Sequence, residues 1–103
     1  MTEATFLVLT ALAEQPQHGY AVLEDVKRIS EGKVKLHVGS LYAVLERLAK
    51  EGLIEVEREE VVQSRLRRYY RLTGAGVAAL GEEMARMKRH VSVAEARLGL
   101  GAA

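Results

Sequence analysis

Apolar side chains recur at helical spacing along the first half of the chain. Over residues 3–14 they cover most of the helix circumference, which indicates burial against more than one neighbour. Over residues 19–31 and 38–51 they form narrower stripes, so these helices should bury one face each. The stripe of the second helix is Tyr20, Val22, Leu23, Val26 and Ile29, and that of the third is Leu41, Leu45, Leu48 and Ala49.

Residues with special backbone or capping properties separate these predicted helices. Thr2 is placed to cap the first helix, and the segment from Pro16 to Gly19 ends it, because proline lacks an N–H donor and glycine permits a turn. Within that turn His18 is expected to satisfy local backbone groups. Gly52 is placed to end the third helix at the position after its last turn.

Three short stretches have the period of two that is typical of strands. Residues 33–36 alternate polar and apolar side chains and are consistent with a short edge strand. Residues 53–58 and 66–72 are predicted to pair as an antiparallel hairpin. By alternation its core-facing side chains are Ile54, Val56, Tyr70 and Leu72.

A fourth helix is predicted over residues 74–98, capped by Thr73. Its apolar residues are spaced alternately three and four apart, which is an unbroken heptad seam. A helix of this length reaches roughly 37 Å, more than the three preceding helices and the hairpin can cover, so the seam needs a second chain. We therefore expect a homodimer. The seam is Val77, Leu80, Met84, Met87, Val91, Ala94 and Leu98.

The order of elements defines the expected fold class. The chain should be mainly α with a small antiparallel β hairpin, arranged as a winged helix-turn-helix followed by a long C-terminal dimerisation helix. Residues 1–72 would form the winged domain and residues 73–103 the dimerisation helix, ending in a frayed tail from residue 99.

Composition excludes several function classes for this sequence of 103 residues. The absence of cysteine removes disulfides and thiolate chemistry, and no apolar run approaches the roughly 20 residues of a membrane helix. We therefore expect a cytoplasmic protein without membrane contact. The histidines and carboxylates show no ligand or catalytic spacing, so we expect no metal, no cofactor and no enzymatic activity.

Charge is uneven along the chain, although the net charge is only +1. Residues 1–32 carry a net −3, whereas residues 33–71 carry +3. The positive charge thus lies on the segment with the third helix and the hairpin, which favours double-stranded DNA as a partner. In this arrangement the third helix enters the major groove and the hairpin contacts the flanking backbone.

Eight residues of this segment are candidates for DNA contacts: Lys35, His37, Gly39, Ser40, Tyr42, Arg65, Arg67 and Arg68. Ser40 can donate to a phosphate or base edge, and Gly39 allows close approach. His37 can contact DNA, cap the helix weakly or respond to pH. The alternative for Tyr42 is a core ring with a solvated hydroxyl. For the arginines it is a charged hairpin paired with its own glutamates, of which Glu59 and Glu60 at the expected tip would repel phosphate.

Three motifs together resemble the PadR family of bacterial transcriptional regulators, in its short branch with one C-terminal helix. They are Pro16-Gln17-His18-Gly19-Tyr20, Gly39-Ser40-Leu41-Tyr42 with Leu45 and Arg47-Leu48, and Arg68-Tyr69-Tyr70-Arg71-Leu72-Thr73 with Gly76. The resemblance implies a homodimeric repressor on a palindromic operator. It also implies, as in some short members, a cavity for a small hydrophobic effector, here lined by Met84, Met87 and Val91. Met87 takes the position of a tryptophan that is important in such a member.

Two other function classes stay open from the sequence. One is a ligand-sensing module whose output depends on a small apolar effector. The other is a winged-helix protein–protein adaptor with little DNA binding, which the acidic wing tip and the near-neutral net charge favour.

Overall fold

The computed structural model describes residues 1–100 and contains four helices and three strands in that range. The frayed tail expected from residue 99 lies partly on residues 101–103, outside the described part. In chain order the elements are α1 (Glu3–Glu14), β1 (Gln17–His18), α2 (Gly19–Ile29), α3 (Val38–Lys50), β2 (Ile54–Val62), β3 (Arg65–Leu72) and α4 (Gly74–Arg97).

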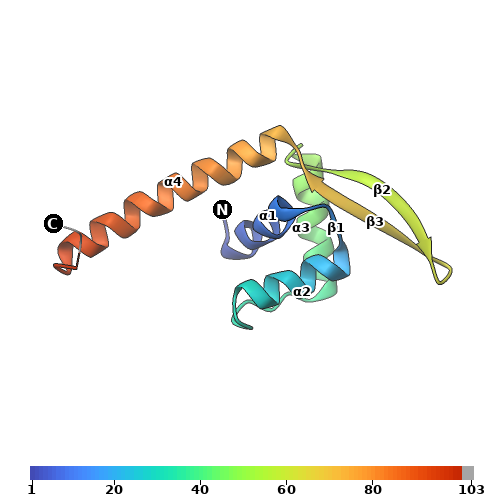
Figure 1. The fold of residues 1–103 in the computed structure, drawn as a ribbon, viewed down its shortest axis with the longest axis horizontal. Coiled ribbons are helices and arrows are strands. Elements are labelled where there is room, and N and C mark those ends of the chain that lie inside the picture. The colour runs from blue at the N-terminus through green and yellow to red at the C-terminus, as the bar shows by residue number, and fades with distance from the viewer. Residues whose placement is uncertain (101–103) are drawn as a thin grey trace.

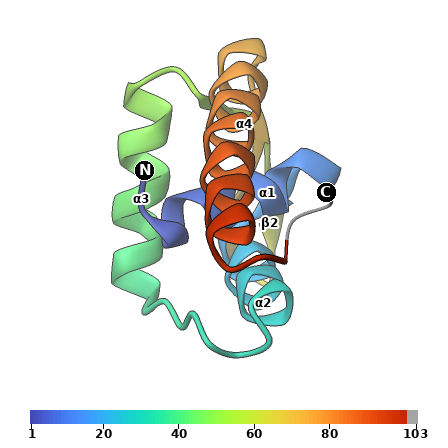
Figure 2. The same cartoon turned by 90° about the vertical axis from the view of Figure 1, so that its left-hand side faces the viewer.

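The first three helices pack together at one end of the hairpin. The hairpin extends from them to one side of the molecule, and α4 extends to the other side (Figure 1). In the view from the C-terminal end of α4, α3 stands to one side, and the loop from α2 to α3 runs along the bottom of the molecule (Figure 2). The buried apolar core draws on all four helices and the hairpin: Leu7, Val8, Leu9, Ala11, Leu12, Val22, Val26, Leu41, Leu45, Leu48, Ile54, Tyr70 and Leu80. None of the helices within residues 1–100 has the length and apolar character required to cross a membrane.

The predicted caps are confirmed. The Thr2 side chain accepts the Thr5 N–H at 3.1 Å, and the Thr73 side chain accepts the Gly76 N–H at 3.1 Å. Gly52 follows α3 with φ +77°, a left-handed conformation that ends the helix at little steric cost. The threonine side chains satisfy backbone N–H groups that the start of a helix leaves without partners. Because these contacts are local, the ends of the helices could be predicted from sequence.

Residues 33–36 do not form the expected strand; a different segment completes the sheet. The sheet order is β1-β3-β2, so β3 is central and β1 occupies its second edge. Gln17 pairs with Tyr70 and His18 with Tyr69. Because both edges of β3 are taken, residues 33–36 form a loop instead. It turns at Ser30, whose hydroxyl accepts the Val34 N–H at 3.0 Å.

The hairpin is longer than predicted, and its turn is shorter. The strands run to Val62 and from Arg65, so Glu59 and Glu60 lie within β2 and the tip is Gln63 and Ser64 alone. These two residues have φ of +51° and +65°. Two consecutive left-handed residues match the twist of the strands, a conformation that Asn-Gly usually signals. Because neither turn residue is glycine, this turn could not be recognised from its residue types.

Several side chains expected inside are exposed. Tyr20 is 65% exposed and Val56 is 43% exposed, and Ile29 and Ala49 are also exposed. Ile54 is fully covered, but Val56, two residues further along β2 on the same face, is not. A period of two identifies the face of a strand but does not show how far the neighbouring helices cover it.

Buried polar contacts join α1 to the other helices. The Gln17 side-chain amide donates to the Ala11 carbonyl at 2.7 Å and to the Asp25 carboxylate at 3.1 Å. Burial raises the pKa of Asp25, but hydrogen bonds from Arg28 and Gln17 outweigh it and hold the pKa below its usual value. On the other side of α1, Arg47 of α3 donates to the Thr5 hydroxyl at 2.7 Å. These contacts fix α2 and α3, which carry the candidate site, relative to α1.

Candidate nucleic-acid interface

The first turn of α3 is open to solvent. Its N-cap is His37, whose side chain makes no capping hydrogen bond. Gly39 and Ser40 are exposed, and no atom lies within 4 Å of a Cβ built on Gly39. The core residue Leu41 anchors the turn from behind. The sequence-predicted candidates on α3 are therefore brought together on one accessible surface, with their backbone positions fixed by the core.

A cleft of about 510 Å³ lies between this helix and the hairpin. Its walls come from the start of α2, from α3 and from both hairpin strands: His18, Gly19, Tyr20, Tyr42, Val62, Gln63, Arg65, Leu66, Arg67 and Arg68. A second hollow of about 280 Å³ involves Tyr42, Leu66, Arg68 and Tyr70. The three candidate arginines and Tyr42 thus line one cleft, although they come from separate elements.

Tyr42 lies against the start of α2. A Cβ on residue 19 would fall 2.6 Å from the Tyr42 hydroxyl oxygen, closer than real atoms approach, so only glycine leaves the ring in place. Tyr42 is therefore held at the edge of the cleft while its side chain stays partly exposed. This contact gives a physical reason for the glycine in the Pro16–Tyr20 motif.

The hairpin arginines differ in whether they have an acidic partner. Arg71 donates through Nε to Glu55 at 2.8 Å, and Arg58 contacts both Glu57 and Glu60 at 2.9 Å. Arg68 lies 3.9 Å from Glu59. Within residues 1–100, Arg65 and Arg67 make no ion pair. The alternative considered from sequence, a hairpin whose arginines pair with its own glutamates, thus holds for part of the hairpin. Within residues 1–100, two arginines of the cleft remain available to contact another molecule.

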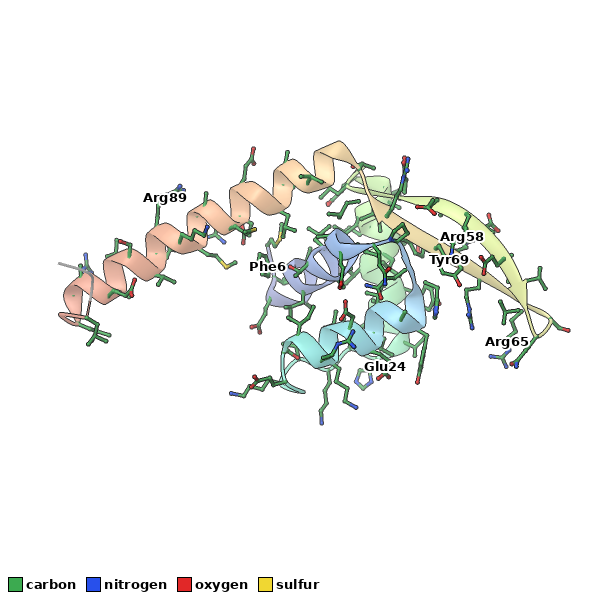
Figure 3. All side chains as sticks on the ribbon, viewed as in Figure 1. Phe6, Glu24, Arg58, Arg65, Tyr69 and Arg89 are labelled. Atoms are coloured by element: carbon green, nitrogen blue, oxygen red, sulfur yellow. The ribbon has the colours of Figure 1, made fainter. Side chains whose placement is uncertain are left out.

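Stacked side chains support the hairpin next to the cleft. His18 meets Tyr69 edge-on with ring centroids 5.3 Å apart, and the guanidinium of Arg58 lies 3.8 Å from the centre of the Tyr69 ring. Figure 3 shows Arg58 and Tyr69 together on the hairpin and Arg65 near its tip. The cation–π contact holds Arg58 along the strand and away from the tip.

His18 caps α2, as expected for a residue that satisfies local backbone groups. Its Nδ1 accepts the Ala21 N–H at 3.4 Å, which requires a deprotonated Nδ1. Burial and the nearby Arg67 charge lower the pKa of His18, against a smaller opposite effect of Glu60. The neutral imidazole is the form that the fold favours.

This lowered pKa predicts a pH-dependent stability. Below about pH 6.5 the unfolded chain binds a proton at this residue before the folded chain does, so the free energy of unfolding should fall as pH drops toward the folded pKa. His18→Asn keeps a side-chain cap but removes the titration. Denaturant unfolding from pH 7.5 to 5 should show a smaller loss of stability for this variant than for the natural chain. Equal slopes for the two proteins would contradict the prediction.

Two residues of this surface were missed from sequence. Tyr20 was placed in the core stripe of α2, yet it lines the cleft. Val38 is an exposed apolar residue at the first position of α3. Exposed methyl groups beside Gly39 and Ser40 suit contact with the methyl of thymine. The position of each residue in its helix could have indicated this, because each stands in the first turn, before the turn that packs on the core.

Lys35 is exposed on the loop before α3 and borders a separate hollow with Leu23, Glu24, Lys27 and Leu36.

The heptad seam of α4 is mostly uncovered in the single chain. Only Leu80 is buried; Met87 is half-buried, and the remaining seam residues are exposed. Met84, Met87 and Val91 line an open hollow of about 370 Å³, bordered by Lys88 and Glu95. Within residues 1–100, no three His, Cys, Asp or Glu side chains are grouped so as to hold a metal ion.

The helices, the three-stranded sheet and the accessible turn of α3 define a winged helix-turn-helix protein. The model of the PadR-like family of transcriptional regulators matches residues 8–82. The chain belongs to this family, so it is a transcriptional regulator and not an enzyme. The winged-helix class and the family resemblance predicted from sequence are both confirmed.

Similar proteins agree with this assignment. A transcriptional regulator of Mycobacterium tuberculosis is 37% identical over 76 residues, which cover 74% of this chain and 67% of that protein. The PadR-like transcription factor of Bacteroides fragilis superposes with a TM-score of 0.76 at 27% identity, over 88% of this chain and 85% of that one. PadR of Bacillus subtilis, solved in complex with operator DNA, has a TM-score of 0.70 at 21% identity, over 78% of this chain and 46% of that one.

Proposed function

We propose that the protein is a homodimeric DNA-binding repressor that recognises a palindromic operator. The observation that carries the proposal is the cleft between α3 and the hairpin, which Tyr42 and the arginines at 65, 67 and 68 line. Cationic and hydroxyl donors at the edge of a groove-sized helix match the contacts that winged proteins make to the DNA backbone. The Bacillus subtilis relative solved with operator DNA supports the same partner for this chain.

In the proposed complex the first turn of α3 reads base edges in the major groove. Gly39 lets the protein backbone approach the DNA closely, and Ser40 donates a hydrogen bond. The His37 side chain makes no capping hydrogen bond and is therefore free to contact DNA. Lys35, on the preceding loop, reaches a flanking phosphate. The backbone that borders the major groove then enters the cleft, where Tyr42 and the wing arginines neutralise it. Recognition and positioning thus fall on different elements.

The second subunit is proposed from α4. Its first turns pack on α1, but the seam beyond Leu80 has no partner within residues 1–100. Four large apolar side chains of the seam are exposed: Val77, Met84, Val91 and Leu98. An apolar stripe of that length on a soluble protein marks an interface. We place the functional boundary between residues 1–72, which contact DNA, and residues 73–103, which join the subunits. The two α3 helices would lie about one turn of DNA apart, roughly 34 Å.

A role in sensing a small hydrophobic effector is the second candidate function. The hollow beside Met84, Met87 and Val91 favours it, because methionine adapts its shape to varied apolar ligands. In a dimer a second chain would close over this hollow. An effector that separates the two α4 helices would change the spacing of the α3 helices and release DNA.

Arg67→Ala tests the contact with the DNA backbone. Because Arg67 lines the cleft without an ion pair among residues 1–100, its loss should weaken binding to all duplexes by a similar factor. The slope of log affinity against log salt should fall by about one for each wing. Fluorescence anisotropy with operator and random duplexes at several salt concentrations measures both.

Two further variants make this test specific. Arg71→Gln removes the same charge from the same strand, but at a guanidinium that Glu55 already holds, so it should leave the salt slope unchanged. Ser40→Ala should instead change the ratio of operator to random affinity, since it removes a donor near base edges. A uniform effect of all three variants would argue against the proposed docking.

A further inference from the structure

A β-bulge in the hairpin decides which glutamate faces which arginine. Register shifts at Glu57, so Val56 pairs with Tyr70 while Arg58 pairs with Tyr69. Beyond the bulge the faces of β2 are exchanged, because side chains alternate with a period of two. Glu59 therefore stands directly opposite Arg68, and Glu60 directly opposite Arg67.

The two glutamates have different partners despite their adjacent positions. Glu60 accepts a hydrogen bond from Arg58 Nε at 2.9 Å, and this bond is the largest cause that lowers the pKa of Glu60. It is thereby held by an arginine that stacks on Tyr69, and within residues 1–100 it makes no ion pair with Arg67. Glu59 has one cationic neighbour within ion-pair range among residues 1–100, and that neighbour is Arg68, with Nε 3.9 Å from the carboxylate.

Arg68 is also the wing arginine that shares both hollows with Tyr42. On the strand it lies on the same face as Leu66 and Tyr70, the face turned toward α3. A phosphate entering the cleft beside Tyr42 therefore reaches the guanidinium that Glu59 already faces. The Arg68 guanidinium is thus within reach of two anionic groups on one side of the hairpin, the Glu59 carboxylate and the phosphate.

We propose that Glu59 is a selectivity-determining residue, which competes with DNA phosphate for Arg68. The inference rests on the proposed DNA-binding function and adds how that function is adjusted. Both side chains are exposed and the contact is long, so the ion pair is weak and DNA can displace it. Displacement occurs where a phosphate is seated beside Tyr42. On loosely bound DNA, Arg68 stays with Glu59 and adds nothing to affinity.

Competition of this kind lowers binding to random DNA more than binding to an operator that seats the backbone in the cleft. Removing the carboxylate should free Arg68 for any nearby phosphate. We expect Glu59→Gln to raise affinity for a random-sequence duplex roughly two- to fivefold per wing, the range of an exposed ion pair. Glutamine keeps the size of the side chain and its place in the strand.

The experiment is a double-mutant cycle, read by fluorescence anisotropy with a labelled random-sequence duplex at low salt. Glu59→Gln, Arg68→Gln and the double variant are compared with the natural chain. We expect the gain in affinity from Glu59→Gln to vanish when Arg68 is already glutamine, because no guanidinium then remains at position 68 for the Glu59 carboxylate to keep from DNA. Glu55→Gln is the matched control, since it makes the same charge change on β2 at a carboxylate held by Arg71.

The possible outcomes separate this inference from the proposed function. A gain of equal size in the Arg68→Gln background, or an equal gain from Glu55→Gln, would show a general effect of net charge and overturn the competition. Unchanged affinity of Glu59→Gln, with normal binding by the natural chain, would overturn it as well and leave DNA binding intact. If the natural chain bound no duplex at low salt, both would fall together.

Discussion

Replacing Gly76 with alanine should destabilise the fold by about 3 kcal/mol, the upper end of the range for an overpacked site. An added Cβ would lie 2.0 Å from the Leu53 carbonyl oxygen and 3.3 Å from Leu72 Cδ2. The carbonyl cannot retreat freely, because it accepts the Thr73 N–H at 3.1 Å. The start of α4 would have to move off the hairpin to make room.

Gly74→Ala is the matched control for this variant. Gly74 lies two residues earlier in the same helical turn, and no atom lies within 4 Å of a Cβ built there. We expect its stability to stay within about 0.5 kcal/mol of the natural chain. Urea unfolding followed by circular dichroism compares the two. Similar midpoints for both variants would contradict the close contact at Gly76.

Val91→Glu should convert the proposed dimer to a monomer that is still folded. In the single chain Val91 is 56% exposed, so a carboxylate there costs the monomer little. In the dimer the seam would bury two such carboxylates without partners, which costs several kcal/mol. The dimer dissociation constant should rise at least about a hundredfold, or roughly 2.7 kcal/mol. Affinity for a two-site operator should fall with it.

Val93→Glu provides the comparison for the seam variant. Val93 is 50% exposed on the same helix, but it lies outside the heptad positions. The same substitution there should leave the association unchanged. Sedimentation velocity over a range of protein concentrations measures the mass of each variant. A dimer that survives Val91→Glu, or one that Val93→Glu disrupts equally, would remove the seam from the interface.

The helices could be predicted from sequence because their information is local. Thr2, Gly52 and Thr73 each act on backbone groups within a few residues, so their roles follow from short spacings. The predicted end of each of the four helices lies within two residues of the observed one. The interface predicted from the heptad pattern of α4 stays a prediction.

The sheet depends on distant residues and was predicted less well. Gln17 and His18 form a strand only because Tyr69 and Tyr70 offer a free edge, and two residues carry no alternation to detect. The bulge at Glu57 and the turn at Gln63 and Ser64 leave no mark in composition either. The stripe assigned to Tyr20 shows the same limit, since apolar spacing does not tell a core contact from the wall of a cleft.

The candidate site combines both kinds of information. The basic strand and the first turn of α3 were visible as a charge cluster and a cap position. Their meeting in one cleft, and the division of the arginines into paired and unpaired ones, required the register of the hairpin. The residue most affected is Glu59, which sequence placed at the acidic tip of the hairpin and the structure places across from Arg68.

Gly76 lies close to the Leu53 carbonyl at the point where α4 leaves the winged domain. With 24 residues, α4 is about 36 Å long, so a tilt of about 5° at its start moves its far end by about 3 Å. That displacement is close to the 3.4 Å rise of one base pair. In the proposed dimer, the residue at position 76 would therefore influence the distance between the two DNA-contacting helices by about one base pair. Relatives with a different residue at this position would then prefer half-sites set closer together or farther apart.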